Sequence, residues 1–69
     1  MHLNTRDTVL KKMLDAQENV RDYESFSKRL DESNDSYAVE VKNMFKEFAE
    51  ESGFQAQKLK EVLEKYDSR

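Results

Sequence analysis

Apolar residues recur at intervals of three and four along two long segments of the chain. An α-helix has about 3.6 residues per turn, so this spacing places the recurring side chains on one helical face. In the first segment they are Val9, Met13, Ala16, Val20, Tyr23, Phe26 and Leu30. In the second segment the same spacing selects Tyr37, Val41, Met44, Phe48, Ser52, Gln55, Leu59, Val62 and Tyr66. The pattern predicts two amphipathic helices, at about residues 5–31 and about residues 36–66.

A short polar stretch separates the two helical patterns. Residues 31–36 read DESNDS, and these residue types cap helices and form turns. Asp35 or Ser36 is the expected N-cap of the second helix. A loop at about residues 32–35 leaves the two helices no arrangement other than an antiparallel αα-hairpin. The sequence therefore predicts an all-α fold, with residues 1–69 as one helical-hairpin domain.

Each predicted helix carries an apolar stripe that is too wide for one neighbouring helix to cover. The chain has 69 residues and no cysteine, so disulfides and thiolate metal sites cannot compensate for a small core. A second copy would close the open faces as a four-helix bundle with crossing angles of about 20°. We therefore expect a homodimer, and its core residues are Met13, Ala16, Val20, Tyr23, Val41, Met44, Phe48, Leu59 and Val62.

Charge and composition exclude several classes of partner. The net charge is −3 and 39% of the residues are charged, with the two signs interspersed. Without a basic stripe the chain is not expected to bind nucleic acid. The acidic balance disfavours an anionic membrane surface, and no apolar run approaches the ~20 residues of a membrane span. The sequence, which shows no secretory signal pattern, predicts a soluble cytoplasmic protein.

The middle of the second helix resembles a known metal-binding helix. Residues 48–59 read FAEESGFQAQKL. This is similar to the second metal helix of rubrerythrins, a branch of the ferritin-like superfamily, which typically reads aliphatic-Ala-Glu-Glu-Glu-x-x-His-Ala-x-x-Leu. The segments VKNMFKE (residues 41–47) and RDYESF (residues 21–26) look like the surroundings of that family's metal motifs. The resemblance implies a ferritin-like bundle, of which one hairpin is half.

The ligand positions implied by this resemblance hold other residues. The family's Glu-x-x-His motif places an oxygen and a nitrogen donor on the same side of the helix. Here these two positions are Ser52 and Gln55, and the glutamate of the first helix would fall near Ala16. None of the three provides an anionic oxygen or an imidazole. We therefore expect no metal and no cofactor, and interpret Ser52 and Gln55 as polar contacts in the dimer core. Gln55 would set the register, as a core asparagine does in coiled coils.

Two alternatives stay open at this point. Glu18, Glu47 and Glu51 lie near the replaced ligand positions, and two chains together would supply enough carboxylates for a di-metal site. Alternatively, the hairpin is an adaptor that binds a helix of another protein through its apolar face. The only histidine is His2, so the usual catalytic triads are excluded and no enzyme is predicted. The leading hypothesis is a non-enzymatic interaction or structural protein.

One glycine interrupts the second helix. Gly53 costs about 1 kcal/mol relative to alanine inside a helix. The expected compensation is close approach of a neighbouring helix backbone beside Ser52 and Gln55.

Overall fold

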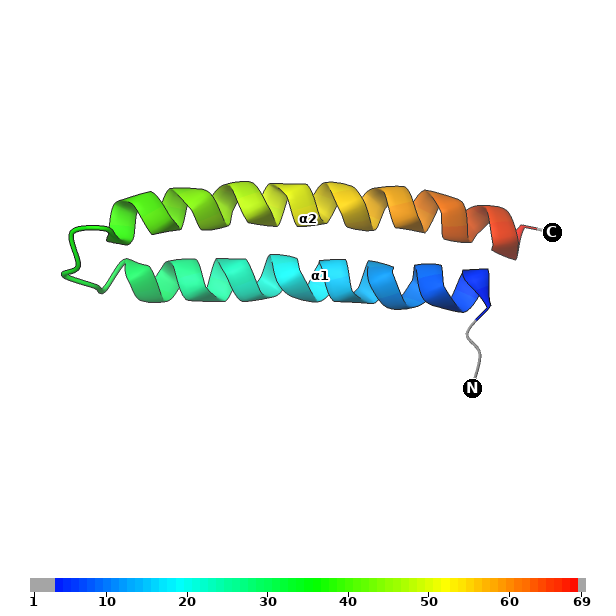
Figure 1. The fold of residues 1–69 in the computed structure, drawn as a ribbon, viewed down its shortest axis with the longest axis horizontal. Coiled ribbons are helices and arrows are strands. Elements are labelled where there is room, and N and C mark those ends of the chain that lie inside the picture. The colour runs from blue at the N-terminus through cyan, green and yellow to red at the C-terminus, as the bar shows by residue number, and fades with distance from the viewer. Residues whose placement is uncertain (1–3, 69) are drawn as a thin grey trace.

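The computed structural model describes residues 4–68, which form two α-helices. Helix α1 spans Thr5–Leu30 and helix α2 spans Ala38–Asp67. The helices run antiparallel and lie side by side along their whole length (Figure 1). The predicted all-α helical hairpin is confirmed. His2, the residue considered for catalysis in the sequence, lies outside the described residues. Within residues 4–68, neither helix is both long enough and apolar enough to cross a membrane.

A side-chain hydrogen bond caps α1, whereas α2 has Tyr37 as its N-cap, without a side-chain cap, instead of the predicted Asp35 or Ser36. The Asn4 side chain accepts a hydrogen bond from the backbone N–H of Asp7 at 2.8 Å, as an N-cap does. Helix α2 begins at Ala38, about two residues later than predicted. The Asp35 carboxylate accepts from the Tyr37 N–H at 2.7 Å, and the Asp35 carbonyl accepts from the Ala38 N–H at 3.1 Å. These bonds make Asp35 part of a turn that precedes the helix, so it is not the N-cap.

Small residues form the closest contact between the helices. In a molecule of two helices, the other helix provides most of the surface against which a side chain can be buried. The side chains that are buried among residues 4–68 are Ala16 on α1 and Ala38, Ser52 and Ala56 on α2. Short side chains at these positions let the helix backbones approach each other closely.

Aromatic rings fill the contact nearer the loop. The Tyr23 ring of α1 lies 5.5 Å from the Phe45 ring and 5.6 Å from the Phe48 ring of α2, centroid to centroid. These separations and the tilted ring planes are typical of favourable aromatic pairs. In the contact between the helices, which we call the seam, these aromatic rings therefore lie between the small Ala38 beside the loop and the small Ala16, Ser52 and Ala56 further along.

Ion pairs join the helices at both ends of the hairpin. Arg6 Nε donates to Asp67 Oδ1 at 2.9 Å at the open end, and Lys42 pairs with Asp31 at the loop end. The hydrogen bond to Asp67, followed by the charge of that carboxylate, raises the pKa of the Arg6 guanidinium above its usual value. Because these groups are exposed to solvent, the pairs align the helix ends more than they stabilise the fold.

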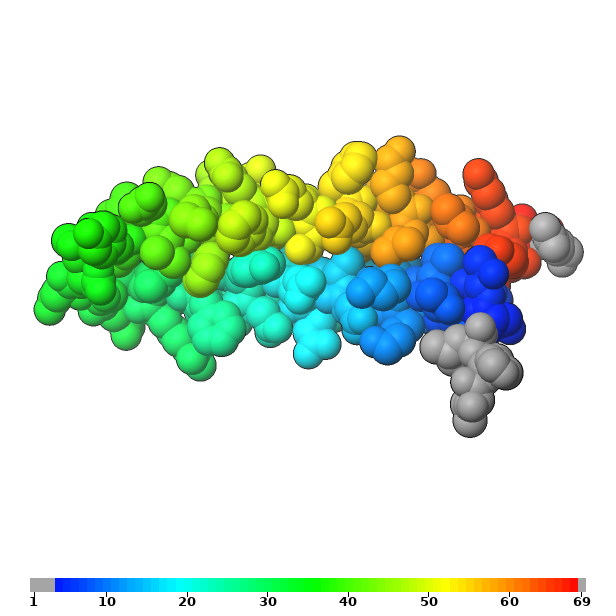
Figure 2. Space-filling view, in the orientation of Figure 1, coloured from blue at the N-terminus to red at the C-terminus, as the bar shows by residue number. Residues whose placement is uncertain are grey.

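The molecule is a single layer of helices. Its extents are 52 × 24 × 12 Å, and the shortest is close to the diameter of one α-helix, about 10–12 Å. The radius of gyration is 15.7 Å, whereas a compact domain of this length has about 11 Å. The hairpin consequently has two broad faces, and Figure 2 shows that side chains of both helices reach the surface of one of them.

We expect Ala56→Leu to push the helices apart and to lower the free energy of unfolding by about 1–3 kcal/mol, because the added atoms have no space at the seam. Urea denaturation followed by circular dichroism would measure this loss. Gln57→Leu is the matched control, since Gln57 is the next residue and is exposed. Equal effects of the two substitutions would contradict a tight contact at Ala56.

Candidate functional site

The three positions that correspond to metal ligands in the resemblance do not come together. Ala16 and Ser52 are buried at the seam, with 4% and 7% of their surface exposed. Gln55 is three residues beyond Ser52 and is exposed. Within one chain the seam encloses a methyl group and a hydroxyl, which cannot replace carboxylate and imidazole ligands. Gln55 reaches solvent in the hairpin, so its contact with a second copy stays a prediction.

The carboxylates that were considered as alternative ligands all lie on the surface. Glu18, Glu47 and Glu51 are exposed. Among residues 4–68, no three histidine, cysteine, aspartate or glutamate side chains are grouped closely enough to hold a metal ion. A di-metal site built from these glutamates would therefore need carboxylates from a second chain.

The predicted core residues divide into two groups. Six of the larger ones are half-buried at the seam: Met13, Val20, Tyr23, Val41, Phe48 and Leu59. The other two, Met44 and Val62, are 44% and 38% exposed. Met44 follows Tyr37 by seven residues, Gln55 follows Met44 by eleven, and Val62 follows Gln55 by seven. Each of these steps is close to a whole number of helical turns. Met44, Gln55 and Val62 therefore form one line along α2, beside the seam, and Tyr37 is the N-cap that precedes the helix.

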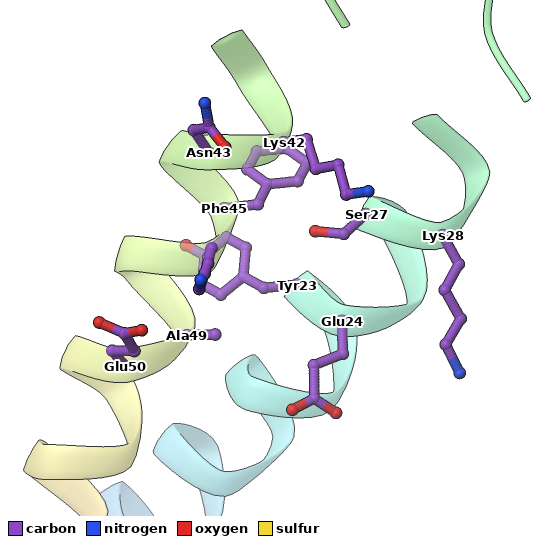
Figure 3. Close-up of a pocket in the computed structure, with 10 residues that line it drawn as sticks. Tyr23, Glu24, Ser27, Lys28, Lys42, Asn43, Phe45, Ala49 and Glu50 are labelled. Carbon is purple, nitrogen blue, oxygen red and sulfur yellow. The ribbon is translucent and has the colours of Figure 1, made fainter. Parts of the chain in front are cut away.

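One broad face of the hairpin contains a shallow groove of about 580 Å³. Tyr23, Phe45 and Ala49 form its apolar part, and Figure 3 shows Tyr23 projecting from α1 towards α2. The other residues that line it are Glu24, Ser27, Lys28, Lys42, Asn43, Lys46 and Glu50. Sequence reasoning missed this groove. Its signal is that Glu24, Lys42 and Lys46 directly follow the seam residues Tyr23, Val41 and Phe45.

The groove has the chemistry of a solvated surface. Lys42 is paired with Asp31, and Lys28 extends away from α2 in Figure 3. The carboxylates of Glu24 and Glu50 balance the remaining positive charge of its rim. Among its ten lining residues there is no histidine or cysteine to activate a nucleophile.

Gly53 is not required for the contact between α1 and α2. A Cβ atom built at Gly53 would meet Val20 Cγ2 at 3.9 Å, which is an ordinary van der Waals distance. Within the hairpin, therefore, the expected close approach of a helix backbone at Gly53 is absent.

No protein-family model, curated protein or solved structure matches this chain. The resemblance to rubrerythrins consequently stays a prediction from the sequence.

Gly53→Ala is expected to raise the free energy of unfolding by about 0.5–1 kcal/mol, because alanine has the higher helix propensity and the structure has room for its methyl group. Thermal and urea denaturation of the two proteins would measure the gain. A loss of stability would show that another chain packs against Gly53 in solution.

Proposed function

We propose that this protein is a non-enzymatic structural or interaction module that acts by self-association. Two hairpins pack their apolar faces together and form a metal-free four-helix bundle of ferritin-like layout. The observation that carries this proposal is the single-layer architecture. Two helices of one chain bury three alanines and a serine among residues 4–68, and this is a very small core for a folded protein.

The exposed surface area supports the same proposal. The chain exposes 5785 Å², whereas the empirical relation for compact proteins gives about 4,500 Å² at a mass of 8.2 kDa. The excess is larger than the ~800 Å² that each partner buries in a protein interface of standard size. The chain therefore exposes enough excess surface to form an interface of at least standard size with a second hairpin.

The resemblance to the ferritin-like superfamily adds support from the sequence. It accounts for a hairpin of two long helices as half of a four-helix bundle. It also places Ser52 and Gln55 at positions that ligate metal in that family, and neither side chain is a good ligand for iron or manganese. A bundle with these residues is a packing unit, and its partner is most simply a second copy of the chain.

Sedimentation equilibrium at micromolar concentration tests self-association. The expected mass is twice the 8.2 kDa of one chain. Because folding would then be coupled to association, the unfolding midpoint should rise with protein concentration. A folded monomer at micromolar concentration, with a midpoint independent of concentration, would refute the proposal.

Metal analysis separates the proposed module from a di-metal carboxylate protein. Protein purified without chelator and then incubated with Fe²⁺ or Mn²⁺ is expected to retain less than stoichiometric metal after gel filtration. The carboxylates available are solvent-exposed, and there is no histidine among residues 4–68 to complete a site. Stoichiometric metal, together with a higher thermal midpoint, would instead support the use of Glu18, Glu47 and Glu51 from two chains.

A further inference from the structure

The two broad faces of the hairpin differ in character, and this difference identifies the interface. Building on the proposed function, we infer that a second copy of this chain binds the face that carries Phe26, Met44, Gln55 and Val62. We call this the apolar face. The opposite side, which contains the groove beside Tyr23 and Phe45, is the groove face, and it stays exposed to solvent in the dimer.

Helix geometry assigns residues to the two faces. In an antiparallel pair of helices, residues that follow a seam residue by the same number of positions lie on the same side of the pair, whichever helix they belong to. The groove demonstrates this, because it brings Glu24 of α1 together with Lys42 and Lys46 of α2, and these residues directly follow the seam residues Tyr23, Val41 and Phe45. Each residue along a helix turns the direction of its side chain by about 100° around the helix axis. Three residues turn it by about 300°, which is equivalent to about 60° in the opposite direction.

A residue three positions after a seam residue therefore lies either in the seam itself, as Phe48 does after Phe45, or on the apolar face. Phe26 follows Tyr23 by three residues on α1. On α2, Met44 follows Val41, Gln55 follows Ser52 and Val62 follows Leu59 at the same offset.

The apolar face collects large side chains that the hairpin leaves uncovered. Phe26 is 47% exposed, Met44 44% and Val62 38%, and Tyr37, the N-cap of α2, is 68% exposed. Phe26, Met44 and Val62 lie beside the seam, where a second layer of helices would cover them. The other large exposed apolar residues, Leu14, Val39 and Phe54, lie on the outer surfaces of the helices, away from the seam.

The faces differ in how much charge they carry. Three lysines and two glutamates line the groove, and covering them with another protein would require their desolvation. On α2 the offset of three also selects one carboxylate, Glu51, which follows Phe48. An amide, Gln55, stands in the middle of the line on α2, and a polar residue at such a position fixes the register of packed helices.

Gln55 and Gln57 provide a matched pair of positions for the test. Both are glutamines on α2 and both are exposed in the hairpin, but Gln57 lies outside the apolar face. Lysine and glutamine have similar helix propensities, so Gln55→Lys and Gln57→Lys should both leave the hairpin folded. Sedimentation velocity over a dilution series would give the Kd of each dimer. We expect Gln55→Lys to raise the Kd at least tenfold, and Gln57→Lys to change it less than twofold.

Single cysteines provide a second measurement that does not depend on weakening the dimer. The natural chain has no cysteine, so Gln55→Cys and Gln57→Cys each carry one nitroxide label at a known place. Continuous-wave electron paramagnetic resonance should show an immobilised label at position 55 and a mobile label at position 57. The contrast should disappear on dilution below the Kd.

The outcomes distinguish the inference from the proposed function on which it rests. A wild-type chain that stays monomeric refutes both. A wild-type dimer that is weakened by Gln57→Lys or by Lys46→Glu, but not by Gln55→Lys, preserves the proposed function and assigns the interface to the groove face. A dimer that tolerates all three substitutions, with both labels mobile, also refutes the apolar face as the interface.

Discussion

The close contact of α1 and α2 at Ala16, Ser52 and Ala56 is the feature on which the rest of the structure depends. Small side chains at a helix contact let the backbones approach, but each removes little apolar surface from water. Tyr23, packed against two phenylalanine rings, adds a larger contribution nearer the loop. The hairpin is thus well defined in geometry while its own core is small.

This constraint links the shape of the molecule to the function proposed for it. A layer that is one helix thick exposes both broad faces, and its apolar residues then gain most by burial against another layer. Association would supply the hydrophobic stabilisation that the seam lacks. Stability and function would then have the same physical origin, because the surface that completes the core is also the surface that binds the partner.

The resemblance to rubrerythrins acquires a structural meaning if the bundle forms. A four-helix bundle holds metal through side chains that project between facing helices. In this hairpin, Ser52 is buried in the seam and Gln55 is exposed beside it, so the two positions do not face one centre within a single chain. Helix packing needs the apolar period and suitable side-chain volumes, whereas metal binding needs particular donor atoms. A chain can retain the first without the second.

The sequence by itself determined the helices, their antiparallel order and the approximate position of the loop, because a period of 3.6 residues and a polar stretch of cap-forming residues are local signals. It did not distinguish Ser52 from Gln55, since both belong to an apolar stripe that is wider than the contact one helix can make. It also did not reveal the groove beside Tyr23, which needs offsets on two helices to meet in space. Only the tertiary pairing of α1 with α2 decided which part of each stripe is buried, and so made Ser52 part of the seam and left Gln55 at the surface.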